Sequence, residues 1–183
     1  MRTPPEPPAY EGRTSRVEDA VATVLRQWQG VHPELDFAPV AVIGRLNRST
    51  ALLQLAVDAP LNREGLTRPE YDILCALRRV GGELTPGRLA RETFASGAAV
   101  TKRIKVLEER GLIGRRPDDR DRRVSHLRLT PTGLALVDRL LPEQLAYEEG
   151  LLSGLPDGRR HELAEILGEL LLLLEGRLGA LSG

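Results

Sequence analysis

Residues 85–130, TPGRLARETFASGAAVTKRIKVLEERGLIGRRPDDRDRRVSHLRLT, decide the fold of this chain. Thr85 and the proline after it are typical of a helix start, because a threonine hydroxyl caps the first turn and a proline there loses no hydrogen bond. This short helix is expected to end near Thr93. Ser96 then caps a second helix, which stops at Gly111. Two helices joined by a tight turn predict a helix-turn-helix.

The second of these helices has an apolar face and a polar face. Val100, Ile104 and Leu107 are spaced at i, i+4 and i+7, so they share the face that packs on the core. The opposite face is small, hydroxylic and cationic, which suits close approach to the major groove of DNA. The alternative is a solvated basic face, as most charged helix faces are. The residues that we predict to contact DNA here are Ser96, Gly97, Ala98, Thr101, Lys102 and Lys105.

An arginine-rich hairpin follows the second helix. Residues 112–116 and 124–129 have the composition of two short strands, and the loop between them is rich in guanidinium groups. Residues 96–130 hold ten cations and five anions, a net charge of +5, whereas the whole chain is formally +0. A positive island on a neutral protein predicts a nucleic-acid footprint, and arginine is favoured in narrow minor grooves. The loop residues predicted to contact DNA are Arg120, Asp121, Arg122 and Arg123.

These motifs together carry a family resemblance. Residues 67–133 resemble the winged helix-turn-helix core of the MarR (multiple antibiotic resistance regulator) family, through LEERGLI at 107–113, the Asp-Arg-Arg turn at 121–123 and HLRLTPTG at 126–133. The resemblance implies that the wing arginine, here Arg123, enters the minor groove and is braced by Asp121. It also implies a dimer formed through the first and last helices. It covers the chain from residue 17 onward.

Composition limits the class of protein. Hydrophobic residues make up 41% of the chain and aromatic residues only 3%, so the core must be aliphatic, which favours a mainly α fold with a small β-hairpin wing. No apolar run approaches the length that spans a bilayer, and the N-terminus has no hydrophobic signal region, so we expect a cytoplasmic protein. The single cysteine, Cys75, excludes an internal disulfide and is expected to be a buried small hydrophobe.

The remaining segments predict helices around this core. Residues 1–16 are proline-rich and are expected to form a disordered tail, followed by one domain over 17–183. Within it, residues 17–64 and 131–183 form a helical dimerisation region, and 65–130 form the DNA-binding region. One long helix is expected from Val40 to about Asn62. A capping box, Thr67 with Glu70, opens the helix under the helix-turn-helix.

The two C-terminal helices carry more apolar surface than one core needs. The first is expected from Pro131 to about Leu152, with Pro142 bending or breaking it. The last is expected from about Pro156 to Leu181, with leucines on more than one face. Such a surplus predicts a partner subunit. The alternative is a helix sandwiched within its own monomer.

Four further residues predict a small-molecule site. Asp72 lies on an apolar-rich helix, where a carboxylate needs a cationic partner, and Arg103 lies at the border of the buried face of the second helix. The chain resembles the urate-type, actinobacterial branch of the family, which implies that Trp28, Asp72, Arg103 and Arg115 surround an anionic effector. The alternative is an Asp–Arg clamp that only holds the helix, with Trp28 as a core residue.

These observations predict a dimeric, sequence-specific DNA-binding transcriptional regulator, a repressor released by a small organic anion. The expected partners are double-stranded DNA with a pseudo-palindromic operator, a second copy of the chain and the anionic effector. A winged-helix module that binds proteins and not DNA is the alternative. The three histidines are scattered and no phosphate-binding glycine loop is present, so we expect no enzymatic activity, cofactor or metal site.

Overall fold

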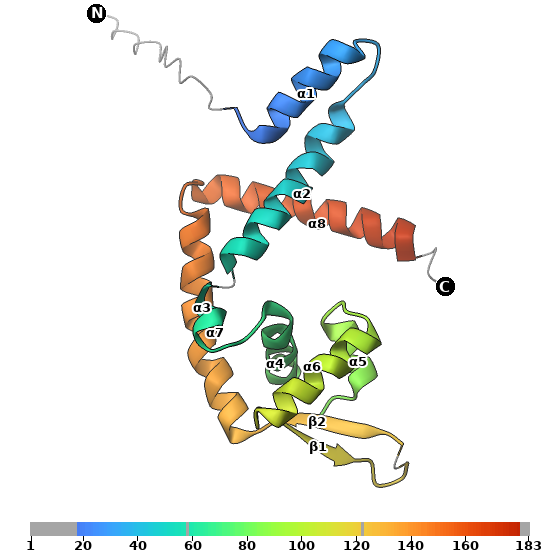
Figure 1. Cartoon of the computed structure of the whole chain (residues 1–183), viewed down its shortest axis with the longest axis vertical. Helices are drawn as coiled ribbons and strands as arrows, with labels where there is room; N and C mark the ends of the chain where they lie inside the picture. Colours follow the sequence, from blue (N-terminus) through green and yellow to red (C-terminus); the bar gives the residue numbers. More distant parts are fainter. Residues whose placement is uncertain (1–17, 58, 122, 180–183) are drawn as a thin grey trace, which may run out of the picture. The chain divides into compact units, whose positions relative to one another are not determined.

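The computed structural model describes residues 18–57, 59–121 and 123–179. The chain divides into two compact units, Met1–Gln54 and Leu55–Gly183. The predicted tail, residues 1–16, lies outside the described residues, as does Arg122. The elements, drawn in Figure 1, are α1 (Ala20–Val31), α2 (Ala38–Val57), α3 (Ala59–Arg63), α4 (Arg68–Val80), α5 (Pro86–Glu92), α6 (Gly97–Glu109), β1 (Ile113–Pro117), β2 (Ser125–Leu129), α7 (Pro131–Leu152) and α8 (Asp157–Gly179).

The first unit is a helical hairpin of α1 and most of α2. Asp19 caps α1, since its Oδ1 accepts hydrogen bonds from the amides of Val21 (2.9 Å) and Ala22 (3.0 Å). Its Oδ2 accepts from Arg45 of α2 at 2.9 and 3.1 Å. A Cβ at Gly44 would lie 3.0 Å from Val21, so glycine allows the two helices to approach closely. No residue of α1 is fully buried, and its apolar residues Val24, Trp28 and Val31 are exposed.

The long helix expected from Val40 to about Asn62 falls in a helical part of the chain. α2 covers Ala38–Val57 and α3 covers Ala59–Arg63, and residue 58 between them lies outside the described residues. One continuous helix over the whole range therefore stays a prediction.

The second unit contains the predicted helix-turn-helix. The caps lie where the sequence places them: the Thr85 hydroxyl accepts from the amide of Arg88 (3.3 Å), and Ser96 Oγ accepts from the amide of Ala99 (3.3 Å). At the start of α4, the Glu70 carboxylate accepts from both the amide and the hydroxyl of Thr67, each at 2.9 Å. The core beneath is aliphatic apart from one tyrosine, and comprises Leu61, Leu66, Tyr71, Ile73, Leu74, Ala76, Leu77, Leu84, Leu89, Val100, Ile104, Leu107, Leu112, Ile113, Leu127, Val137 and Leu140.

The wing is an antiparallel hairpin of β1 and β2, in register from Ile113 opposite Leu129 to Pro117 opposite Ser125. A backbone bridge between Leu84 and Leu127 ties it to the segment before α5. Gly133 is required where α7 leaves the wing, because a Cβ there would lie 2.1 Å from the Leu112 carbonyl oxygen. The hairpin projects beyond the helices and ends in a free tip (Figure 1).

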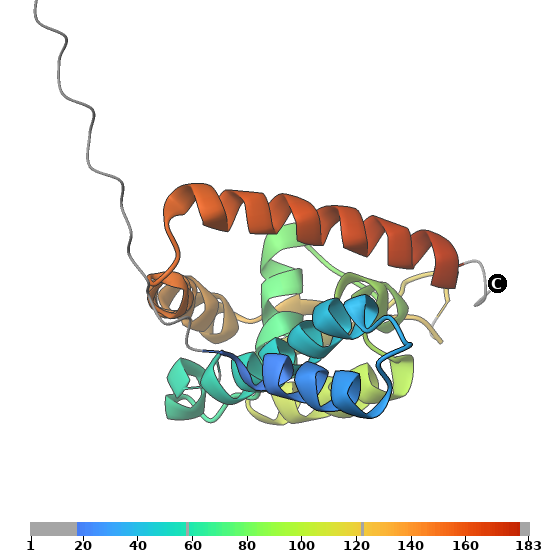
Figure 2. The ribbon, with the colours of Figure 1, turned by 90° about the horizontal axis from the view of Figure 1, so that it is seen from above.

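The C-terminal helices α7 and α8 extend beyond the hydrophobic core. α7 runs without interruption through Pro142, so of the two expected outcomes the local break is wrong and the bend stays a prediction. α8 is one continuous helix (Figure 2). None of its described side chains is buried. Arg160 and Leu170 are half-buried, and the other described side chains are exposed. Its exposed apolar residues are Leu163, Ile166, Leu167, Leu171, Leu172, Leu173 and Leu174.

Candidate nucleic-acid interface

The predicted division of α6 into two faces is confirmed. Val100, Ile104 and Leu107 are 0% exposed. All six residues predicted to contact DNA on this helix are exposed. Close approach is open at the start of the helix, because a Cβ on Gly97 would meet no atom within 4 Å. Contact of this face with DNA stays a prediction.

Polar groups on this face differ in how far they are already engaged. The hydroxyl of Thr101 donates to the Gly97 carbonyl at 2.8 Å, as threonines in helices often do. The ammonium of Lys105 lies 3.8 Å from Glu109, a weak exposed pair. Lys102 enters no ion pair with the rest of residues 18–57, 59–121 and 123–179, so its charge is available to a ligand.

The wing tip, which here means residues 118–121 and 123, is built around Asp118. Its Oδ1 accepts hydrogen bonds from the amides of Arg120 (2.8 Å) and Asp121 (3.0 Å), and its Oδ2 lies 2.8 Å from His126 Nε2. The bond from His126, followed by those from the two amides, lowers the pKa of the Asp118 carboxyl to about 2. The tip is therefore a folded element and not a loose loop.

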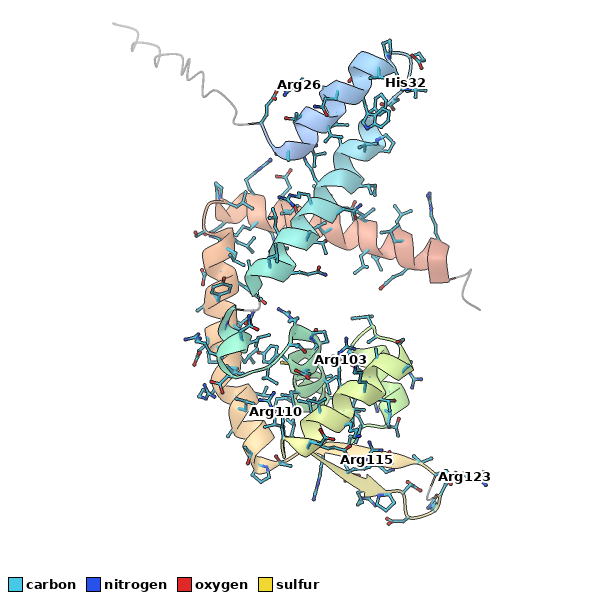
Figure 3. The ribbon with its side chains drawn as sticks, in the orientation of Figure 1. Arg26, His32, Arg103, Arg110, Arg115 and Arg123 are labelled. Carbon is cyan, nitrogen blue, oxygen red and sulfur yellow. The ribbon has the colours of Figure 1, made fainter. Side chains whose placement is uncertain are left out.

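The brace that the resemblance implies for Arg123 acts on its main chain. Asp121 Oδ1 accepts from the backbone amide of Arg123 at 3.0 Å. Asp121 thus fixes the main chain that carries the arginine, while the exposed guanidinium extends at the end of the hairpin (Figure 3). The two residues are therefore linked as the resemblance implies, through the backbone amide of Arg123, and the entry of its guanidinium into the minor groove stays a prediction.

Several cations counted in the positive island are used inside the protein. Arg110 donates to the carbonyls of Glu64 and Gly65, each at 2.7 Å. Arg116 is held by Glu83 (2.9 Å) and Asp119 (3.1 Å). Within the described residues, the exposed island cations whose side chains have neither an ion pair nor a hydrogen bond are Lys102, Arg120, Arg123 and Arg128.

The predicted small-molecule residues are only partly brought together. Asp72 and Arg103 line one cavity of about 150 Å³ between α4, the turn before α6, and α6. They do not pair: Asp72 Oδ1 accepts from Arg68 Nε at 2.9 Å. Arg115 is absent from the cavity lining, because Glu108 binds its guanidinium at 2.7 and 3.0 Å. The expectation that Arg115 joins this cavity is therefore wrong for the described structure.

Trp28 belongs to the first unit and is described there. It lies near the end of α1, is 49% exposed, and stacks on His32 and Phe37 with ring centroids 6.0 and 6.3 Å apart. It is not a buried core residue. Figure 3 labels His32 beside it, and Arg103 and Arg115 on α6 and the hairpin.

Sequence reasoning missed two residues of these sites. Arg68 joins Asp72 to Glu148 of α7, whose Oε1 it contacts at 2.9 Å. The i, i+4 spacing of Arg68 and Asp72 was a readable signal for this pair. Asp118 was counted only as an anion, although an aspartate at the start of a loop is a common acceptor for the amides that follow it. A larger hollow of about 650 Å³, between the end of α4, the hairpin and the start of α7, contains none of the predicted residues.

Other classes of site find no support in the described chain. In residues 18–57, 59–121 and 123–179 no three His, Cys, Asp or Glu side chains are placed to hold a metal ion. No helix in these ranges combines the length and apolar character needed to cross a membrane. Burial raises the pKa of the Cys75 thiol, which keeps it protonated and unreactive at neutral pH.

Comparison with known proteins points to a family. The MarR family profile matches residues 64–124. The HTH-type transcriptional regulator PecS of Dickeya dadantii is 32% identical over 152 residues, which cover 82% of this chain and 92% of PecS. AbsC, a MarR family transcriptional regulator from Streptomyces coelicolor, has a TM-score of 0.67 at 26% identity, over 78% of this chain and 97% of AbsC. BpsR of Bordetella bronchiseptica, whose DNA binding is regulated by 6-hydroxynicotinic acid, has a TM-score of 0.65 at 26% identity, over 70% and 91%.

Proposed function

The chain belongs to the MarR family, and from that premise we propose that it is a dimeric, sequence-specific DNA-binding transcriptional regulator, a repressor released by a small organic anion. The observation that carries the proposal is the pairing of an exposed, small and cationic face on α6 with a hairpin tip whose main chain is already folded. Short helices with such a face read the major groove, and a wing arginine suits the minor groove beside it.

Uncovered apolar surface supports the dimer. α8 exposes leucines along its length, and α1 has no buried residue. Surface of this kind on a small protein is stable in water only when a partner covers it. We assign dimerisation to residues 17–64 and 131–183 and DNA binding to residues 65–130.

A two-fold dimer fixes the geometry of the operator. Two recognition helices related by a two-fold axis enter successive major grooves, so the half-sites lie about 10 bp apart and form a pseudo-palindrome. Occupation of such a site over a promoter excludes other proteins, which is the simplest route to repression.

The cavity beside α6 supports an anionic effector. Arg103 lines it without an ion pair in the described structure, and Asp72 opposite is already neutralised by Arg68. A volume near 150 Å³ equals about five waters in the liquid, which suits a small organic anion. Because the cavity lies between α4 and α6, a bound ligand would shift α6, the proposed recognition helix, relative to α4. The urate-type assignment rests on the matching sequence positions of Trp28, Asp72 and Arg103.

The test is an electrophoretic titration of the full chain on DNA from its own upstream region, at two salt concentrations, with and without a panel of small anions that includes urate. We expect tight binding that weakens steeply with salt, and release by one anion class. Arg103→Ala should keep DNA binding and lose the response to that anion. Absence of DNA binding by folded dimer at low salt would favour the protein-interaction module.

A further inference from the structure

We propose that Asp118 is the positioning residue of the wing: its carboxylate, held in place by His126, folds the tip so that the arginines of the tip meet DNA in a preset arrangement. This inference rests on the proposed function and deepens it. Asp118 is not among the residues predicted to contact DNA, and it acts through the main chain of its neighbours.

The tip closes through Asp118 at several points. Its amide donates to the Val124 carbonyl at 2.9 Å, and the amide of Val124 donates to the Asp121 carbonyl at 2.8 Å. Its Oδ1 accepts from the amides of Arg120 and Asp121 at 2.8 and 3.0 Å. One carboxylate oxygen therefore engages two consecutive amides of a loop that makes no strand pairing.

His126 supplies the fixed end of this arrangement. It lies on β2, in register with Arg116 of β1, and its neighbour Leu127 is 0% exposed. A carboxylate oxygen can only accept, so the imidazole must donate from Nε2 across the 2.8 Å to Asp118 Oδ2. The side chains of both residues are largely shielded, with 22% and 30% exposure. The sheet thereby holds Oδ2, and Oδ1 is aimed at the loop.

The benefit is entropic. Without Asp118, the main chain of Arg120 and Asp121 would have to be ordered when DNA binds, and each residue ordered at that moment lowers affinity. With Asp118 in place the ordering cost is met during folding. The folded tip also fixes the backbone positions of Arg120 and Arg123, from which their side chains extend.

Asp119 provides a matched control because electrostatics alone predicts the same sign for both aspartates. Removing a carboxylate near a polyanion should raise affinity. Asp119 is 90% exposed, and its ion pair is with Arg116, which Glu83 also holds. Asp119→Ala therefore changes the charge and leaves the tip folded, whereas Asp118→Ala makes the same charge change and removes the acceptor.

The experiment measures operator affinity for Asp118→Ala, Asp118→Asn, Asp119→Ala, Arg123→Ala and the double variant Asp118→Ala/Arg123→Ala, each checked for its folded dimer state. We expect Asp118→Ala to weaken binding about tenfold, the size of one lost charge-assisted hydrogen bond. Asp119→Ala should bind as tightly as the parent or more tightly. Asp118→Asn should recover most of the loss, since its amide oxygen still accepts from the loop.

The double variant shows whether Asp118 acts through the tip. If it does, Asp118→Ala should cost little once Arg123 is gone, so the two effects are not additive. Equal effects of Asp118→Ala and Asp119→Ala, or full additivity with Arg123→Ala, overturn the inference. If Arg123→Ala is itself without effect, the proposed DNA interface fails, which is a different result from failure of the positioning role alone.

Discussion

The wing and α8 belong to the same unit but differ in how far their side chains and backbone groups find partners within the chain. In the wing, backbone amides of the tip are met by Asp118 and Asp121, and Leu127 beneath is fully buried. In α8 no described side chain is buried, and Leu172 is 71% exposed. The contacts of the wing tip are made within one chain, whereas α8 leaves an apolar surface exposed to solvent. We therefore propose that the wing is preorganised for DNA before binding and that α8 gains its stability from a second subunit.

The largest expected effect follows from breaking α8. Leu171 and Leu174 are 55% and 40% exposed, although both are apolar. Leu171→Glu/Leu174→Glu places charges where we propose a subunit contact, so we expect monomers and at least a hundredfold loss of operator affinity, because one half-site is then bound alone. Sedimentation and electrophoretic titration measure both. Glu165→Ala, on the same helix, should change neither, and a dimeric double variant would contradict this use of α8.

A core truncation sharpens the same contrast through stability. Leu107 is 0% exposed in the winged helix, so Leu107→Ala should cost about 2–5 kcal/mol of unfolding free energy through lost burial and a cavity. Leu172 is 71% exposed, so Leu172→Ala should lower the unfolding free energy by less than about 1 kcal/mol in a monomeric background. Urea titration of each variant gives the values. Equal costs would mean that the two regions are not organised differently.

The tip arginine should have a smaller effect, confined to DNA binding. Arg123→Ala removes one exposed cation from a folded tip, so the operator affinity should fall about tenfold and the slope of log affinity against log salt should fall by about one. Its thermal stability should match the parent. An unchanged salt slope would show that Arg123 does not meet DNA.

The smallest effect concerns pH and the tip. The folded-state pKa of Asp118 is about 2, below its usual value of 3.8. Such a group stabilises the folded state fully above about pH 4, and the contribution is lost as the pH falls toward 2. A carboxyl titration by NMR should show this low pKa, and His126→Gln should raise it, because the bond from His126 is its largest cause. An Asp118 pKa that His126→Gln leaves unchanged would show that His126 does not hold the Asp118 carboxylate.

The sequence predicted those parts of the fold that depend on local chemistry. The caps at Thr85 and Ser96 and the buried face of α6 follow from spacing and residue type, and all are confirmed. Pro142 shows where such local rules reach less far, since α7 is uninterrupted although a proline inside a helix removes a backbone hydrogen bond.

The candidate sites were less predictable because they depend on which partner wins. Asp72 needs a cation, but sequence cannot rank Arg68, one turn away, against Arg103 across the core. Arg115 was expected in the cavity and is bound by Glu108 instead. Asp118 looked like one of three loop anions, and only its placement beside His126 and two amides shows what it holds.

Hydroxyl-radical footprinting of the dimer on its operator tests the central claim most directly. We expect two protected patches related by a two-fold axis, with centres about 10 bp apart, each combining a major-groove contact with protection of the adjacent minor groove that disappears in Arg123→Ala. A single unsymmetrical patch, or two patches that Arg123→Ala leaves unchanged, would contradict it.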